Sequence, residues 1–210
     1  MGEDTEISRA GAHIMSKTGN TNGDSREITV MSWNVNGLGS KLKRGIVSQY
    51  LNRHNPEIIL LQETHLAGNK CGFLGRGKYK MIVHAGFTTG ARGVAILMRR
   101  SFPFKFIRTW VNAGGQYTAV TGELQGEKIT LTSWYLPPGL QSMTLKKLGD
   151  WLTILPESLL VLGGDFNLTM NGVEDRIIKG VSGTSEDQRL RTFASAIGLT
   201  DLWRSEHPGR

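Results

Sequence analysis

The stretch that decides the fold is Leu159-Leu160-Val161-Leu162-Gly163-Gly164-Asp165-Phe166-Asn167. Four consecutive apolar residues followed by a glycine pair predict a strand that is buried on both faces. Such a strand carries Asp165 and Asn167 at its C-terminal end, where catalytic groups often lie in mixed α/β sheets. Residues i and i+2 of an extended chain point the same way, so this carboxylate and this amide could face one ligand. The alternative is an ordinary turn, because Gly, Asp and Asn are common turn residues.

The composition is typical of a soluble globular protein with a sizeable core. The 210 residues are 39% hydrophobic and 20% charged, with a formal net charge of +7. Residues 1–25 carry a net charge of −2, which leaves +9 for the rest of the chain. This positive charge favours a polyanionic partner such as nucleic acid. Basic proteins without such a partner are common, so the charge alone does not identify one.

The cysteine content and the N-terminus indicate an intracellular protein. A single cysteine, Cys71, cannot form an internal disulfide, and a cysteine-based zinc site would need more thiolates. The sequence has no signal peptide and no apolar run near the ~20 residues that cross a bilayer. Glu6 stands where N-myristoylation needs Ser or Thr. We therefore expect an intracellular, nuclear location and no membrane partner.

The pattern along the chain predicts one domain after a polar extension. Residues 1–26 are polar without an apolar period, which predicts a disordered extension, and residues 27–210 form the domain. Helices are expected over residues 41–53, 145–155 and 188–197, with a polar loop over 182–187. The first helix should turn Leu42, Ile46, Val47, Tyr50 and Leu51 inward, and the second Leu145, Leu148, Trp151, Leu152 and Leu155. Strands are expected over residues 28–34, 57–63, 79–84, 93–98, 102–111, 116–124, 128–135 and 159–165.

These elements predict an α/β fold. Two strand-helix-strand crossovers are expected, over residues 28–63 and 128–165. Two sheets packed face to face, with the helices outside, would bury all the strands.

Polar side chains stand at the ends of four of these strands. They are Asn34, Glu63, Tyr135 and the Asp165/Asn167 pair. A carboxylate at the end of an apolar strand is costly to bury unless it is paired or binds a metal. Glu63 and Asp165 together would suit Mg²⁺, which takes one or two carboxylates plus water and substrate phosphate. The alternative is that Glu63 only caps the following loop.

Three other features are weaker signals. Residues 72–78 satisfy the G-x-x-x-x-G-K pattern, but Tyr79 stands where a nucleotide-binding loop has Ser or Thr. Asn167-Leu168-Thr169 is a glycosylation sequon without a secretory signal. His65 either binds a ligand or hydrogen-bonds within its loop.

Several motifs taken together resemble the endonuclease/exonuclease/phosphatase superfamily. They occur in the superfamily's order over residues 27–210: Ser32-Trp33-Asn34-Val35-Asn36-Gly37, Gln62-Glu63-Thr64-His65, Gly93-Val94-Ala95-Ile96-Leu97, Trp134-Tyr135-Leu136-Pro137 and Gly164-Asp165-Phe166-Asn167. The Asp175-Arg176 pair and the closing Asp201-Leu202-Trp203-Arg204-Ser205-Glu206-His207-Pro208 resemble the endonuclease domains of LINE-type non-LTR retrotransposons, which are similar to apurinic endonucleases.

The resemblance implies a fold and a reaction. The fold would be a four-layer α/β/β/α sandwich of two mixed sheets, and the reaction a metal-dependent hydrolysis of a DNA phosphodiester. Glu63 would bind Mg²⁺, for which Mn²⁺ can substitute, with Asn34 beside it. Asp165 would activate the attacking water, while Asn167 and Tyr135 would hydrogen-bond the scissile phosphate.

The resemblance also bears on the partners. Double-stranded DNA would be the substrate, nicked to prime reverse transcription by a monomer that needs no small-molecule cofactor. Asn36, His65 and Arg176 would contact the DNA. For Arg176 a solvated loop arginine is an equal alternative.

The chain departs from the superfamily at its C-terminus. Superfamily members continue with further strands, a catalytic Asp and a terminal His, whereas this sequence stops at Arg210. We therefore expect a sandwich without its last strands and an inactive or impaired nuclease. Two alternatives stay open: a non-catalytic DNA-binding remnant, and a phosphodiesterase similar to apurinic endonucleases. The Trp-Arg-x-x-His-Pro ending argues against an inositol phosphate or sphingomyelin substrate.

Overall fold

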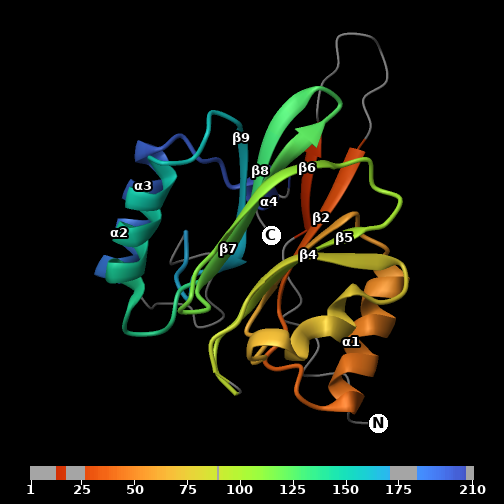
Figure 1. Cartoon of the computed structure of the whole chain (residues 1–210). Coiled ribbons are helices and arrows are strands. Elements are labelled where there is room, and N and C mark those ends of the chain that lie inside the picture. Colours follow the sequence, from red (N-terminus) through yellow and green to blue (C-terminus); the bar gives the residue numbers. More distant parts are fainter. Residues whose placement is uncertain (1–12, 18–26, 89, 171–183, 207–210) are drawn as a thin grey trace. The chain divides into compact units, whose positions relative to one another are not determined.

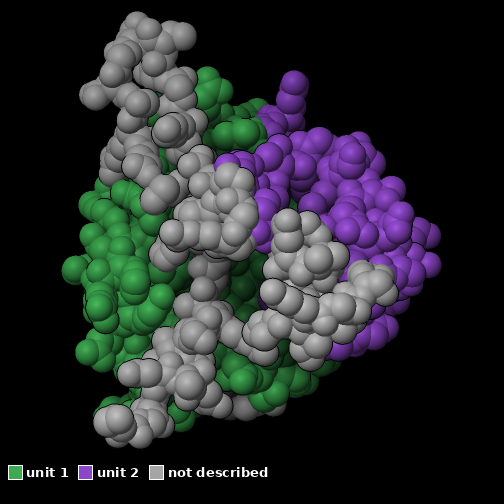
Figure 2. All heavy atoms as spheres, turned by 180° about the vertical axis from the view of Figure 1, so that it is seen from behind, with its two compact units in different colours: residues 1–135, 159–164 green, residues 136–158, 165–210 purple. Residues whose placement is uncertain are grey.

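The computed structural model describes residues 13–17, 27–88, 90–170 and 184–206 (Figure 1). The chain divides into two compact units, coloured separately in Figure 2. The first comprises Met1–Tyr135 and Leu159–Gly164, and the second Leu136–Ser158 and Asp165–Arg210. Among the helices described, none combines the length and the apolar character needed to cross a membrane.

The first unit contains a mixed sheet with the order β1-β2-β3-β5-β4. Its strands are β1 (His13–Lys17), β2 (Glu27–Asn34), β3 (Ile58–Gln62), β4 (Tyr79–Ala85) and β5 (Val94–Arg99). Strands β2 and β3 are parallel, with Asn34 opposite Gln62, and helix α1 (Lys41–His54) connects them. The predicted crossover over residues 28–63 is therefore confirmed.

Strand β1 lies in the stretch for which the sequence predicts disorder. Residues His13–Lys17 pair antiparallel with Glu27–Met31. The backbone groups along this edge of β2 are thereby hydrogen-bonded instead of open. The prediction is wrong for this strand, and the rest of residues 1–26 lies outside the described chain.

The second sheet has the order β6-β7-β8-β9. Its strands are β6 (Lys105–Val111), β7 (Tyr117–Leu124), β8 (Glu127–Tyr135) and β9 (Leu159–Asp165). Strand β9 is not buried on both faces as predicted, since only Val161 and Gly163 are buried and Leu159 is 52% exposed. Strand β9 is the last strand in the order of this sheet, so among the described residues it has a neighbouring strand on one side only.

The glycine pair of β9 packs against a neighbouring strand and does not form a turn. A Cβ atom on Gly164 would lie 2.1 Å from the carbonyl oxygen of Trp134 in β8. A Cβ atom on Gly163 would lie 2.4 Å from Leu60 Cδ1 in β3. The two residues are glycine because the backbone of β9 comes this close to its neighbours.

The two sheets pack face to face within the first unit. Residues of the first sheet, such as Val30, Leu60 and Ile96, share one apolar cluster with Val120 and Leu131 of the second. Strand β3 is buried along its whole length. With two sheets packed face to face and α1 on the outer face of the first, the predicted α/β class is confirmed. The division into an extension and one domain stays a prediction.

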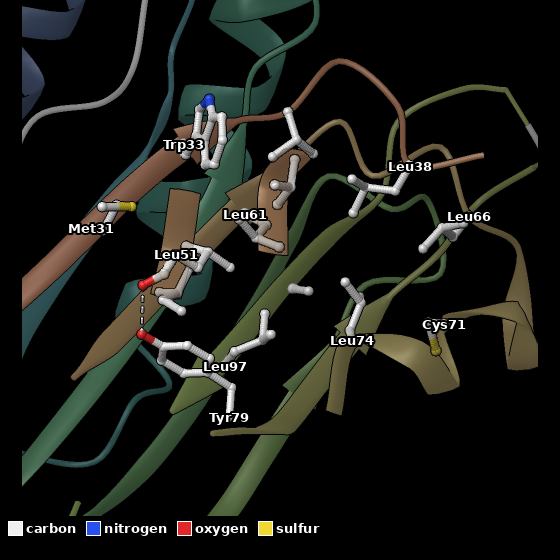
Figure 3. Packing of buried hydrophobic residues seen from close by; sticks show 14 residues of the cluster. Met31, Trp33, Leu38, Leu51, Leu61, Leu66, Cys71, Leu74, Tyr79 and Leu97 are labelled. Atoms are coloured by element: carbon white, nitrogen blue, oxygen red, sulfur yellow. Dashed lines mark hydrogen bonds between the residues drawn. The ribbon is translucent and has the colours of Figure 1, made fainter. Parts of the chain in front are cut away.

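The other face of the first sheet is covered by α1 and the 3₁₀ segment η1 (Gly68–Gly75). Figure 3 shows this cluster, in which the Tyr79 hydroxyl donates to the Leu51 carbonyl at 3.1 Å. Helix α1 buries Val47 and Leu51 as predicted.

The inward face of α1 is narrower than predicted. Leu42 is 76% exposed and Ile46 is 42% exposed, so the prediction is wrong for both. Both fit the helical period, but the cluster beneath α1 is filled by other residues of the sheet and of η1.

The second unit is helical in its described part. Its helices are α2 (Gln141–Leu152), α3 (Ser185–Ala196) and α4 (Leu202–Glu206), and α2 contacts α3. Leu145, Leu148 and Trp151 are buried as predicted, whereas Leu152 and Leu155 are only partly buried. Helix α3 begins three residues before the predicted start, because Thr184 accepts a hydrogen bond from Asp187 N and caps it.

Candidate active site

The loops that follow β2 and β3 stay paired beyond the ends of the strands. Gly37 N donates to Glu63 O at 2.7 Å, and Leu38 N donates to Thr64 O at 2.9 Å. Because β2 and β3 are parallel, their carboxyl ends meet at one edge of the sheet. The side chains of Asn34 and Glu63 are thereby brought together, as the sequence predicts.

The loop that precedes β5 joins the same edge. Thr64 N donates to Gly93 O at 2.9 Å and His65 N donates to Arg92 O at 2.7 Å. Glu63, His65 and Arg92 all have a positive φ, of 51°, 56° and 51°. Non-glycine residues adopt this left-handed conformation at a cost of order 1–3 kcal/mol each, and such residues cluster at functional sites.

Two side chains fix the carboxylate of Glu63. Asn34 Nδ2 donates to Glu63 Oε1 at 2.9 Å, and His65 Nε2 lies 3.2 Å from Glu63 Oε2. The amide oxygen of Asn34 accepts from Asn36 N at 2.9 Å, which sets the orientation of the amide. The carboxylate is therefore held from both sides while its side chain remains 20% exposed.

These residues fit a divalent cation of the magnesium type. A carboxylate offers about four lone-pair sites, and Asn34 and His65 occupy one on each oxygen. Mg²⁺ needs only one or two carboxylates, with waters and substrate oxygens completing its coordination. No group of three or more His, Cys, Asp or Glu side chains suited to a metal occurs within the described residues. Of the residues described in this loop, Glu63 could hold such an ion, and in this arrangement Asn34 orients Glu63.

Thr64 and His84 pack on the buried side of the loop that carries Glu63, a role that the sequence did not reveal. Thr64 is fully buried, and its Oγ1 lies 3.2 Å from His84 Nε2. Burial lowers the pKa of His84. A Cβ atom on Gly93, whose φ is +94°, would lie 2.4 Å from Thr64 Oγ1. The segment that carries Glu63 is thus packed tightly on its inner side.

Tyr135 ends β8 within the same unit. Its backbone N donates to Gln116 O at 2.7 Å, and its side chain is 8% exposed and clusters with Ala85 and Val94. The predicted hydrogen bond from its hydroxyl to a phosphate stays a prediction.

Asp165 and Asn167 belong to the second unit. Asp165 Oδ1 accepts from Asn167 N at 3.0 Å, and Asn167 Nδ2 donates to Leu136 O at 2.9 Å. Leu136 N donates to Asp165 O at 2.9 Å. The Asp-Phe-Asn turn is therefore closed on itself and tied to the residue that follows β8. Arg176 lies outside the described residues.

Asp187, at the start of α3, holds the residues that follow the Asp-Phe-Asn turn through its contact with Thr169. Its carboxylate accepts hydrogen bonds from Thr169 N at 2.9 Å, Thr184 N at 2.6 Å and Thr184 Oγ1 at 2.8 Å, and the residue is fully buried. The sequence assigned Asp187 to a polar loop. The Thr184-x-x-Asp187 spacing is that of a helix-capping pair and could have located it.

We expect Asp187→Asn to lower the free energy of unfolding by about 2 kcal/mol. The single oxygen of an amide cannot accept all three hydrogen bonds that the carboxylate accepts. Burial alone would raise the pKa of Asp187, but the hydrogen bonds from Thr169 and Thr184 outweigh it and the pKa is lowered. A lowered folded-state pKa means that the stabilisation is complete above about pH 4, the unfolded value, and declines as the pH falls below it.

Urea denaturation of both proteins at pH 7 and at pH 3 measures this effect. The difference in the free energy of unfolding between the wild type and Asp187→Asn should be smaller at pH 3 than at pH 7. A difference that stays constant or widens would contradict the role given to the Asp187 carboxylate.

Comparisons with known proteins identify the family and the fold of the chain. Residues 31–209 match the model of the Endonuclease/Exonuclease/phosphatase family. The chain is 23% identical over 189 residues to the Transposon TX1 uncharacterized 149 kDa protein of Xenopus laevis, covering 86% of this chain and 14% of that protein. It thus spans about one seventh of this relative.

Solved structures show the same fold. An AP endonuclease from Archaeoglobus fulgidus superposes with a TM-score of 0.67 at 21% identity, covering 87% of this chain and 76% of that one. The endonuclease domain of TRAS1, a telomere-specific non-LTR retrotransposon, superposes with a TM-score of 0.59 at 16% identity, covering 80% and 70%. On the family match over residues 31–209, this chain belongs to the Endonuclease/Exonuclease/phosphatase family.

Proposed function

We propose that this chain is a Mg²⁺-dependent endonuclease domain that nicks double-stranded DNA. The impaired activity expected from the sequence stays a prediction, and the proposal is that a measurable Mg²⁺-dependent rate remains. The observation that carries the proposal is the Glu63 carboxylate, which Asn34 and His65 hold at the end of a buried strand with coordination sites to spare. An oriented, partly exposed carboxylate of this kind suits a hard cation that also binds a phosphate.

The family motifs give several residues a role in the proposed reaction. The ion held by Glu63 would neutralise charge on the phosphoryl oxygens of the scissile bond. Asp165 would take a proton from the attacking water, and Asn167 would donate to a non-bridging oxygen. These last two roles follow from the family motif. The hydrogen bonds of the turn fix both side chains, and one N–H of Asn167 Nδ2 is used by Leu136 O. Tyr135 would add a further donor to the phosphate.

Charge and similarity support DNA as the substrate. The chain carries a net charge of +7, which attracts a polyanion. The similar TX1 protein is a transposon protein, and the TRAS1 domain is a retrotransposon endonuclease. We propose that the nick primes reverse transcription at a chromosomal target in the nucleus, with the domain acting as a monomer.

A second candidate function is cleavage at abasic sites. It is favoured by the TM-score of 0.67 to the AP endonuclease from Archaeoglobus fulgidus, against 0.59 to the TRAS1 domain. Both candidates share the reacting groups and differ in the DNA that is recognised.

Nicking of intact and of partly depurinated supercoiled plasmid, each with Mg²⁺, separates the two functions. The proposal predicts that intact plasmid is nicked and that depurination changes the rate little. Nicking confined to depurinated plasmid would replace the proposal by the second candidate, and nicking of neither would reject both.

A further inference from the structure

An aromatic ring and a guanidinium group lie together in the loop between β4 and β5. The Arg92 Cζ atom is 4.9 Å from the centroid of the Phe87 ring, and Phe87 is 45% exposed. At this exposure part of the phenylalanine side chain is open to a ligand.

Hydrogen bonds connect this pair to the Glu63 loop. The carbonyl of Arg92 accepts from His65 N at 2.7 Å, and Gly90 N donates to the carbonyl of His65 at 3.2 Å. His65 in turn contacts the Glu63 carboxylate. Within the first unit, Phe87 and Arg92 are therefore close to the proposed metal ligand.

The β6–β7 loop also contacts the backbone next to Phe87 and Arg92. Gly93 N donates to Gly115 O at 3.0 Å, and a Cβ atom on Gly115 would lie 2.9 Å from Phe87 Cβ. Gly115 has a φ of +65°, so the β6–β7 loop can approach Phe87 this closely. The base of the ring is anchored, the Arg92 guanidinium lies over the ring, and Phe87 remains 45% exposed.

The Arg92 guanidinium keeps most of its hydrogen-bonding capacity. Its Nη1 donates to Gly114 O over a long 3.4 Å, and no ion pair involves Arg92 in the described part of the chain. A guanidinium carries five N–H donors in a planar fork that matches a phosphate. The backbone of Arg92 has a positive φ of 51°, and its carbonyl is held by the hydrogen bond from His65 N.

We propose that Phe87 and Arg92 form a DNA-binding platform, in which the ring stacks on an unstacked base and the guanidinium binds a phosphate of the same strand. This inference rests on the proposed function. Aromatic faces bind bases without regard to sequence, and arginine tracks the phosphate backbone. Pyrimidine–purine steps of duplex DNA are flexible and easily unstacked, which makes a base face available.

Binding of two fluorescent duplexes in EDTA tests the platform without any cleavage. One duplex is fully paired and the other carries one extrahelical base. Phe87→Ala should weaken binding of the second duplex about tenfold, the loss expected for one base stack, and Phe87→Trp should preserve it. Arg92→Gln should weaken both and lower the slope of log Kd against log salt by about one.

Two matched controls lie elsewhere in the same unit. Phe106→Ala removes another phenylalanine, 55% exposed, at a position of β6 opposite Gly122. Arg53→Gln removes an exposed arginine in the last turn of α1. Asn34 precedes this helix, whereas Arg53 lies near its end. The platform is refuted if Phe87→Ala matches Phe106→Ala on the extrahelical base, or if Arg92→Gln matches Arg53→Gln in salt slope.

The binding test is independent of the nicking test. A wild-type protein that binds as described but does not nick plasmid with Mg²⁺ would reject the proposed function and leave the platform in place. A protein that nicks normally while Phe87→Ala and Arg92→Gln behave as their controls would reject the platform alone.

Discussion

Glu63→Gln is expected to lower the rate of Mg²⁺-dependent nicking by at least about 10³-fold, which corresponds to about 4 kcal/mol of lost transition-state stabilisation. Glutamine keeps the shape of the side chain and can still accept the hydrogen bond from Asn34 Nδ2. It loses the negative charge that would hold the cation. The loss should therefore appear in the rate and not in the stability of the fold.

A single-turnover nicking assay on supercoiled plasmid measures this effect, with Glu127→Gln as the control. Glu127 is an exposed carboxylate at the start of β8, the opposite end of that strand from Tyr135. The control should nick as fast as the wild type. Equal rates for Glu63→Gln and Glu127→Gln would remove Glu63 from the mechanism.

Gly164→Ala is expected to lower the free energy of unfolding by about 3 kcal/mol and the melting temperature by about 10 °C. The added Cβ atom would lie 2.1 Å from the Trp134 carbonyl oxygen, 2.8 Å from its carbon and 3.0 Å from its nitrogen. These are backbone atoms of β8, so a side-chain rotation cannot relieve the overlap. Strand β9, which leads into Asp165, would have to shift.

Gly45→Ala serves as the opposite control. Gly45 lies inside α1, has no neighbour within 4 Å of an added Cβ atom and is not in the left-handed region. Its replacement should raise stability by about 0.5–1 kcal/mol, the difference in helix propensity. Thermal denaturation of both variants decides the matter, and a Gly164→Ala protein as stable as the wild type would show that β9 does not pack so closely on β8.

The contact between Asn34 and Glu63 follows directly from the sequence. Two apolar strands joined by a helix of 14 residues are expected to be parallel, and parallel strands bring their carboxyl ends to one edge. The structure has Asn34 opposite Gln62, so Glu63 is the next residue beyond the pair. The apolar character of the two strands and the length of the helix between them were sufficient evidence here, because a strand-helix-strand crossover leaves few other arrangements.

Other parts of the site depend on contacts between distant residues, which local patterns do not encode. The hydrogen bond of His84 to Thr64 joins residues 20 positions apart, and the left-handed φ of Arg92 is imposed by its pairing with His65. The Gly163–Gly164 pair suggested either a strand end or a turn, and only the position of β8 shows that close backbone packing selects glycine. Exposure of β9 likewise reflects its place at the edge of the sheet.

The most direct test of the account is nicking of intact supercoiled plasmid by the purified wild-type chain, once with Mg²⁺ and once with excess EDTA. The account predicts conversion to open circles with Mg²⁺, none with EDTA, and recovery when Mg²⁺ is restored. Conversion that proceeds equally in EDTA, or a folded protein that leaves the plasmid supercoiled in Mg²⁺, would contradict it.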